Sequence, residues 1–168
     1  MSDQIELYDG VSQNPLDNVE DILNDNNWIY SRKNKDEIIV NLSGKACDYR
    51  MIFLWQEQMN ALQLYCQYDM TISHKNIDVA ACAIMNMNSN LWMGHFELNK
   101  DSKSPCFRQT NLINIDGNNK DYSHIEDLLE ISLTQCERYQ HVFELLSTDE
   151  NIDMQILSFA MMETQGES

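Results

Sequence analysis

The chain has 168 residues, which is enough for one domain built around one hydrophobic core. With 43% hydrophobic residues, 5 Gly and 2 Pro, its composition excludes a disordered or fibrous chain. Asp and Glu number 27 against 11 Lys and Arg, and the resulting net charge of −16 argues against nucleic acid, which clustered cations bind.

A first helix is predicted after a polar leader at residues 1–13. Asn14 can cap the free backbone amides, and Pro15 suits the first helical position because its missing N–H would be unpaired there anyway. The apolar residues that follow share one helical face, and they are Leu16, Val19, Ile22 and Leu23.

Four strands are expected next, over residues 28–32, 38–42, 47–55 and 62–70. The last two carry the strongest strand signal and are predicted to form a hairpin. Their side chains alternate between two faces of the sheet. On the first strand of the hairpin, one face carries Tyr49, Met51, Phe53 and Trp55, and the other carries Asp48, Arg50, Ile52 and Leu54. Both faces therefore hold apolar groups.

The second half of the chain reads as a helix, two strands and two helices. A helix from residue 73 to about 90 is predicted to bury Ile77, Ala80, Ala81, Ile84 and Met85. Strands over 91–98 and 106–113 and a loop over 115–121 follow. Ser123 and Glu126 have capping-box spacing and start a long helix, and a last helix over 151–162 presents Ile152, Ile156, Phe159 and Met162.

This order of elements predicts an α+β fold, with an antiparallel sheet of about six strands and helices packed mainly on one face. We expect a single domain over residues 14–164, followed by a frayed tail at 165–168.

Two pairs of titratable residues could carry chemistry. Asp48 and Arg50 share one strand face, as do His95 and Glu97. The first pair is interpreted as an ion pair that holds strand register, and His95 as a surface or hydrogen-bonded histidine. The alternative is a small-molecule sensor or enzyme with a site near these four residues.

No metal-ligand spacing, phosphate loop or dinucleotide fingerprint occurs in the sequence, so we expect no metal, no cofactor and no catalytic residue. His124 and His141 are expected to face solvent. The odd number of cysteines, without a CxxC pair, predicts reduced core thiols at Cys47, Cys66, Cys82, Cys106 and Cys136.

The first ten residues have no apolar core of the kind a secretory signal requires. The longest wholly apolar run, residues 79–85, is far shorter than the roughly 20 residues that span a bilayer. We therefore expect a cytoplasmic protein that does not bind membranes.

Several short motifs are distributed over residues 14–164. Among them are Asn14-Pro15-Leu16-Asp17, Cys47-Asp48-Tyr49-Arg50, Asn60-Ala61-Leu62-Gln63, Leu91-Trp92-Met93-Gly94-His95-Phe96 and Cys136-Glu137-Arg138-Tyr139. Together they resemble the YbjN family, which is described as bacterial sensory transduction regulators. The resemblance implies a fold similar to type III secretion chaperones, which bind protein segments, and a regulatory rather than catalytic role.

The charge, the aromatic strands and the resemblance predict a non-enzymatic regulatory or chaperone-like module. Its partner is expected to be a protein or peptide, and the negative charge would steer a basic one toward it. Aromatic residues exposed in a patch mark contacts, so we assign the protein-binding role to Tyr49, Trp55 and Tyr65 of the hairpin. The contact could be with a client or with a second copy in a homodimer; alternatively, a late helix buries this surface.

Overall fold

The structure, a computed structural model, describes residues 14–114 and 122–165, with side chains as far as Met162. The expected leader, the loop at 115–121 and the last three residues of the tail lie outside the described residues. The predicted order of elements is confirmed. The elements are α1 (Pro15–Asp25), β1 (Tyr30–Asn34), β2 (Glu37–Ser43), β3 (Asp48–Gln56), η1 (Glu57–Met59), β4 (Ala61–Tyr68), η2 (His74–Asn76), α2 (Ile77–Asn90), β5 (His95–Leu98), β6 (Pro105–Leu112), α3 (Ser123–Ser147) and α4 (Met154–Gln165).

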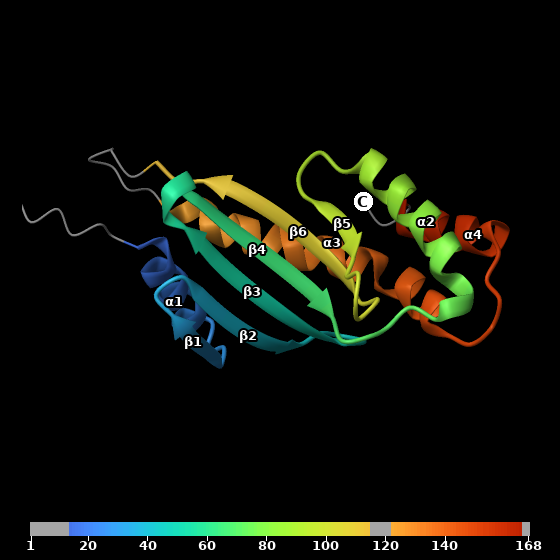
Figure 1. Ribbon diagram of the computed structural model, residues 1–168, viewed down its shortest axis with the longest axis horizontal. Helices are drawn as coiled ribbons and strands as arrows, with labels where there is room; N and C mark the ends of the chain where they lie inside the picture. Colours follow the sequence, from blue (N-terminus) through green and yellow to red (C-terminus); the bar gives the residue numbers. More distant parts are fainter. Residues whose placement is uncertain (1–13, 115–121, 166–168) are drawn as a thin grey trace, which may run out of the picture.

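The six strands form one sheet in the order β1-β2-β3-β4-β6-β5, and every neighbouring pair is antiparallel. Figure 1 views this sheet with α3 crossing behind it, α1 beside β1 and β2, and α2 and α4 gathered near β5. The predicted α+β class and the antiparallel six-stranded sheet are confirmed.

The hydrophobic core lies between the sheet and the helices. The predicted alternation of the hairpin is confirmed, because every second residue is buried: Tyr49, Met51, Phe53 and Trp55 on β3, and Leu62, Leu64, Cys66 and Tyr68 on β4. Helix α1 adds Leu16, Val19 and Leu23 to the same core, and α3 adds Ile125, Leu129, Tyr139 and Phe143. Helices α1 and α3 therefore cover one face of the sheet, and each large apolar side chain buried there contributes about 1.5–3 kcal/mol.

Polar contacts position these two helices. The Tyr68 hydroxyl donates to the backbone oxygen of Cys136 at 2.5 Å, which ties α3 to β4. Arg32 of β1 contacts carboxylate oxygens of Asp17 and Glu20, both at 2.7 Å, which ties α1 to the sheet edge.

The buried faces of α2 and α4 differ from the prediction. Helix α2 buries Ala80, Ala83 and Met87, while Ala81 and Met85 are exposed. In α4 the buried residues are Leu157 and Ala160, while Ile156, Phe159 and Met162 are exposed. Residues 79–90 of α2 and 154–162 of α4 contain no charged residue, and apolar side chains occur on more than one side of each helix. The spacing of apolar residues therefore does not select the buried face.

Helix α3 begins at the serine of its capping-box motif. Ser123 is the first helical residue, which confirms the predicted helix start, and the N-cap is Tyr122, which makes no side-chain cap hydrogen bond. His141 was expected to face solvent, but its Nε2 lies 2.9 Å from the backbone oxygen of Ala160 and joins α3 to α4.

Strand β5 is shorter than predicted, because it starts at His95 rather than at residue 91. Gly94 has φ +68°, and a Cβ at this position would lie 2.4 Å from the Phe107 ring. The left-handed conformation limits the strand at this end, and the close approach to Phe107 leaves room only for glycine.

Candidate functional site

The second face of the sheet is covered by no helix of the described residues, and we call it the open face. Its members follow from the strand register, because alternate residues point to one side and cross-strand partners share a side. They are Ser31 of β1, Glu37, Ile39, Asn41 and Ser43 of β2, Asp48, Arg50, Ile52, Leu54 and Gln56 of β3, Ala61, Gln63, Tyr65 and Gln67 of β4, Cys106, Arg108, Thr110 and Leu112 of β6, and His95 and Glu97 of β5.

An apolar band crosses the middle of the open face. Ile39, Ile52 and Tyr65 are successive partners on β2, β3 and β4, so their side chains lie in one row. Ile52 and Tyr65 are half-buried, as is Leu54 in the next row, and Leu112 near the end of β6 is 77% exposed. Apolar surface therefore reaches solvent in the centre of the face and at one end.

A charged cluster continues the row of Tyr65 toward β5. The Arg108 guanidinium lies 5.0 Å from the centroid of the Tyr65 ring, within the range of a cation–π contact. Arg108 Nη1 also lies 3.7 Å from Glu97 Oε2, and His95 Nε2 lies 3.3 Å from the same oxygen. His95 is thus an exposed, hydrogen-bonded histidine, as the sequence indicated, and Arg108 is a member of the cluster that sequence reasoning missed.

A group of hydrogen-bonded polar side chains lies on the other side of the band. Gln63 Oε1 accepts from Gln56 Nε2 and from the Tyr65 hydroxyl, both at 3.3 Å, and Gln63 Nε2 donates to Thr110 Oγ1 at 3.3 Å. Most polar groups in this part of the face therefore bond to one another.

A polar hollow of about 330 Å³ occupies the end of the open face near the start of β3. It is lined by Asn41, Asp48, Arg50, Gln67 and Asp69, together with parts of Tyr49 and Tyr68. In the part of the chain that the structure describes, Asp48 and Arg50 form no ion pair, so the predicted register-holding salt bridge is absent and the interpretation is wrong.

The four residues of the alternative small-molecule site share the open face but do not form one site. The hollow contains Asp48 and Arg50, while His95 and Glu97 belong to the charged cluster. Arg50 and Glu97 lie in one row of the sheet with two strands between them, which corresponds to about 14 Å.

The three residues assigned to protein binding are divided between the two faces. Tyr49 and Trp55 are 3% and 6% exposed, because their side chains point into the core that α1 and α3 cover. These two residues are therefore corrected from contact residues to core residues. Tyr65 points the other way and remains on the open face.

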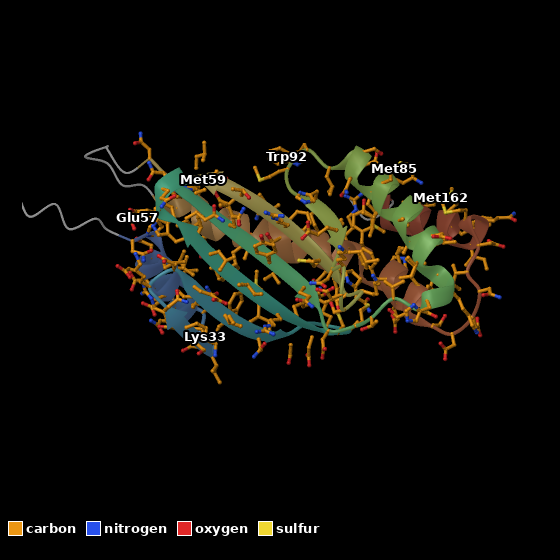
Figure 2. The ribbon with its side chains drawn as sticks, in the orientation of Figure 1. Lys33, Glu57, Met59, Met85, Trp92 and Met162 are labelled. Carbon is orange, nitrogen blue, oxygen red and sulfur yellow. The ribbon has the colours of Figure 1, made fainter. Side chains whose placement is uncertain are left out.

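Both edges of the sheet are protected against the addition of another strand. On β5, Asn88 of α2 bonds to both backbone groups of Phe96, with its Nδ2 donating to the carbonyl at 2.9 Å and its Oδ1 accepting from the amide at 2.7 Å. On β1, the register shifts between Arg32 and Asn34, and Lys33 is exposed there (Figure 2). Irregular register and lysine are common means of protecting an edge.

The cysteines are free thiols, but only some are core residues as predicted. Cys66, Cys106 and Cys136 are buried, Cys47 is half-buried and Cys82 is exposed. Burial raises the pKa of the Cys106 thiol to about 12, which opposes formation of the nucleophilic thiolate.

Two other kinds of site, a metal centre and a membrane span, are absent from the described residues. No group of three or more His, Cys, Asp or Glu side chains in residues 14–114 and 122–162 is placed to hold a metal ion. No helix in the described part of the chain combines the length and hydropathy that a membrane span requires.

Large apolar side chains are also exposed away from the open face. Trp92, in the connection between α2 and β5, is 82% exposed, and Met85 of α2 and Met162 of α4 are each 66% exposed (Figure 2). Residues 79–96 contain no Asp, Glu, Lys or Arg, so this region is neutral although the chain is strongly acidic.

Comparisons with known proteins agree with this fold. Residues 15–145 match the YbjN family, described as "Putative bacterial sensory transduction regulator". The structure is similar to the crystal structure of YbjN from E. coli, described as "a putative transcription regulator", with a TM-score of 0.51 and 11% sequence identity over 75% of this chain and 92% of that chain. At this identity the similarity concerns the fold. No curated protein matches the sequence.

Proposed function

Because this chain belongs to the YbjN family, we propose that it is a regulatory module without catalytic activity that binds a partner protein on the open face of its sheet. The family description supports a regulatory role. The exposed apolar residues of the open face support its assignment as the binding surface. The chaperone-like function that the resemblance implies is one form of such binding.

The apolar band within a polar surround carries this proposal. Protein interfaces combine a desolvated apolar centre with a polar rim, and aromatic residues and Arg are enriched in them. Ile52, Leu54 and Tyr65 supply the centre, Arg108 is stacked on Tyr65, and the exposed Leu112 extends the apolar surface.

The charge of the chain indicates the chemistry of the partner. A net charge of −16 attracts a basic surface and repels an acidic one. The open face itself carries carboxylates at Glu37, Asp48 and Glu97 around the apolar band. Since both sheet edges are protected, we propose that a basic partner docks its apolar residues on the face rather than adding a strand.

Capture by the full chain tests the proposal. Leu54→Ser with Tyr65→Ser removes the centre of the band, and Phe159→Ser is the matched control because Phe159 is 65% exposed on α4, outside the open face. Each protein is immobilised and exposed to a native lysate at low salt, and bound proteins are quantified by mass spectrometry. We expect a basic protein bound by the parent and by the Phe159 variant, lost from the double variant, and released by about 0.5 M salt through screening.

Two outcomes contradict the proposal. One is a partner that the Leu54 and Tyr65 double variant retains at the parent level. The other is the reproducible absence of any protein bound by the parent and not by the double variant.

A further inference from the structure

The polar hollow on the open face has the composition of a ligand site. We propose that it binds a free α-amino acid, whose carboxylate contacts Arg50 and whose ammonium contacts Asp48 and Asp69. This inference does not depend on protein binding elsewhere on the face.

The first observation is that the polar side chains of the hollow have no protein partner. In the described structure Asn41, Asp48, Arg50, Gln67 and Asp69 form no side-chain hydrogen bond and no ion pair, whereas the neighbouring polar residues of the open face bond to one another. The hollow is therefore the part of this face whose hydrogen-bonding capacity is free for an external molecule.

Arg50 differs in this respect from two other arginines of the sheet. Arg32 contacts Asp17 and Glu20, and Arg108 contacts Glu97. With 27 carboxylate side chains and 11 cationic ones in the chain, a carboxylate partner for an arginine is easily supplied. Among the residues that the structure describes Arg50 has none, although its planar guanidinium is suited to bidentate binding of a carboxylate.

The strand register places donors and acceptors in two rows. Asn41, Arg50 and Gln67 are successive partners on three strands, so they form a donor row with neighbours about 4.8 Å apart. Asp48 lies two residues along β3, which places the acceptor row about 6.8 Å from the donor row. The backbone amide of Asp69 donates to the carbonyl of Asp48 at 2.9 Å, which places the two aspartates opposite each other, and both line the hollow.

This arrangement selects a zwitterion. Like charges on directly opposed positions of adjacent strands are unfavourable, so a cation between Asp48 and Asp69 is stabilising. A simple ammonium would leave Arg50 unused, and a simple carboxylate would be repelled by the two aspartates. An α-amino acid carries both groups on one carbon and can contact both rows while its side chain points toward solvent.

Nuclear magnetic resonance titration of the full chain provides the test. Glycine is the probe, methylammonium and acetate each present one of its two charged groups, and backbone amide shifts report binding. We expect saturable shifts at residues 41, 48–50 and 67–69 with glycine at millimolar concentration, and none with acetate or methylammonium in the same range. Arg50→Gln and Asp48→Asn should each weaken glycine binding about tenfold or more, the effect of losing a charged hydrogen-bond partner.

Lys33→Gln is the matched control, because Lys33 is an exposed cation of β1 outside the hollow, and it should bind glycine as the parent does. The proposal is overturned if glycine produces no saturable shift in the parent, if methylammonium binds as tightly as glycine, or if Arg50→Gln leaves the affinity unchanged. Well-dispersed spectra of the variants show that they are folded. Since this titration uses no protein partner, its failure leaves the capture experiment unaffected.

Discussion

Asn88 bonds to Phe96 as a neighbouring β-strand would, with one side-chain amide bonding to both the carbonyl and the amide of a single residue. Phe96 lies on the edge strand β5, where its side chain packs into the core and its backbone groups point away from β6. Helix α2 therefore ends the sheet at this edge by means of one side chain.

Replacing Asn88 with Ala should both destabilise the fold and open this edge. Two hydrogen bonds are lost, and we expect the free energy of unfolding to fall by about 1–3 kcal/mol. The exposed backbone of Phe96 should also promote association at high concentration. Urea denaturation and sedimentation check the two effects, with Asn86→Ala as control, because Asn86 is exposed on the same helix. Equal stability of the two variants would contradict the assignment.

Trp55 and Tyr65 should behave differently although both lie on the same hairpin. Trp55→Ala removes a core side chain and is expected to cost about 3–5 kcal/mol. Tyr65→Ala, on the open face, should cost about 1 kcal/mol, mostly through the lost contact with Arg108. Chemical denaturation measures both values. A Trp55 variant as stable as the Tyr65 variant would show that Trp55 is not a core residue.

Gly94→Ala is expected to destabilise the protein by about 3 kcal/mol. Alanine in the left-handed region costs about 1–2 kcal/mol, and contact of its methyl group with the Phe107 ring adds to this. Because Phe107→Leu removes part of the ring, a double-mutant cycle should show a smaller cost of Gly94→Ala in that background. Strictly additive effects on the free energy of unfolding would mean that contact with the Phe107 ring does not contribute to the cost of Gly94→Ala.

Asn76 is fully buried and should hold the connection between α3 and α4. Its Nδ2 lies within hydrogen-bond distance of the carbonyl oxygens of Leu146, Thr148 and Glu150, and its Oδ1 accepts from the amide of Ile152. Asn76→Ala is expected to cost about 3 kcal/mol and to speed hydrogen exchange at the Ile152 amide. At neutral pH, Asn76→Asp should destabilise at least as much, because a carboxylate cannot donate. An Asp variant with parental stability would be inconsistent with this role.

The stability of the fold should decrease at alkaline pH. Burial raises the pKa of Cys106 from 9.0 to about 12, and burial also raises the pKa values of Tyr68 and Cys136. The unfolded chain therefore loses these protons at lower pH than the folded chain. The contribution of the thiols to the free energy of unfolding is constant below about pH 9 and decreases above it. Each such group contributes a slope of about 1.4 kcal/mol per pH unit.

Urea denaturation between pH 8 and pH 11 measures this slope. Cys106→Ala removes one of the titrating groups, so its stability should decrease less steeply with pH than that of the parent. An identical slope in the two proteins would show that Cys106 does not contribute.

Much of the candidate surface follows from the sequence because a β-strand alternates its side chains with period two. This alternation assigns the residues of β3 and β4 to two faces correctly, and it places Asp48, Arg50, His95 and Glu97 on strand faces. The alternation does not indicate which face the helices cover when both faces contain apolar residues. Tyr49 and Trp55 were assigned to the contact surface for this reason, whereas packing with α1 and α3 places them in the core.

The sequence by itself determined the order of the elements, the antiparallel sheet and the division of each strand into two faces, because these depend on local spacing and on turn residues. The tertiary structure decided the rest. The buried faces of α2 and α4 are selected by their neighbours, since each helix has one charged residue near an end, Asp78 or Glu163, and none in its middle that distinguishes one side. The bond between Asn88 and Phe96, the stacking of Arg108 on Tyr65 and the free polar side chains of the hollow depend on strand register and helix position, which bring together residues that no local pattern connects.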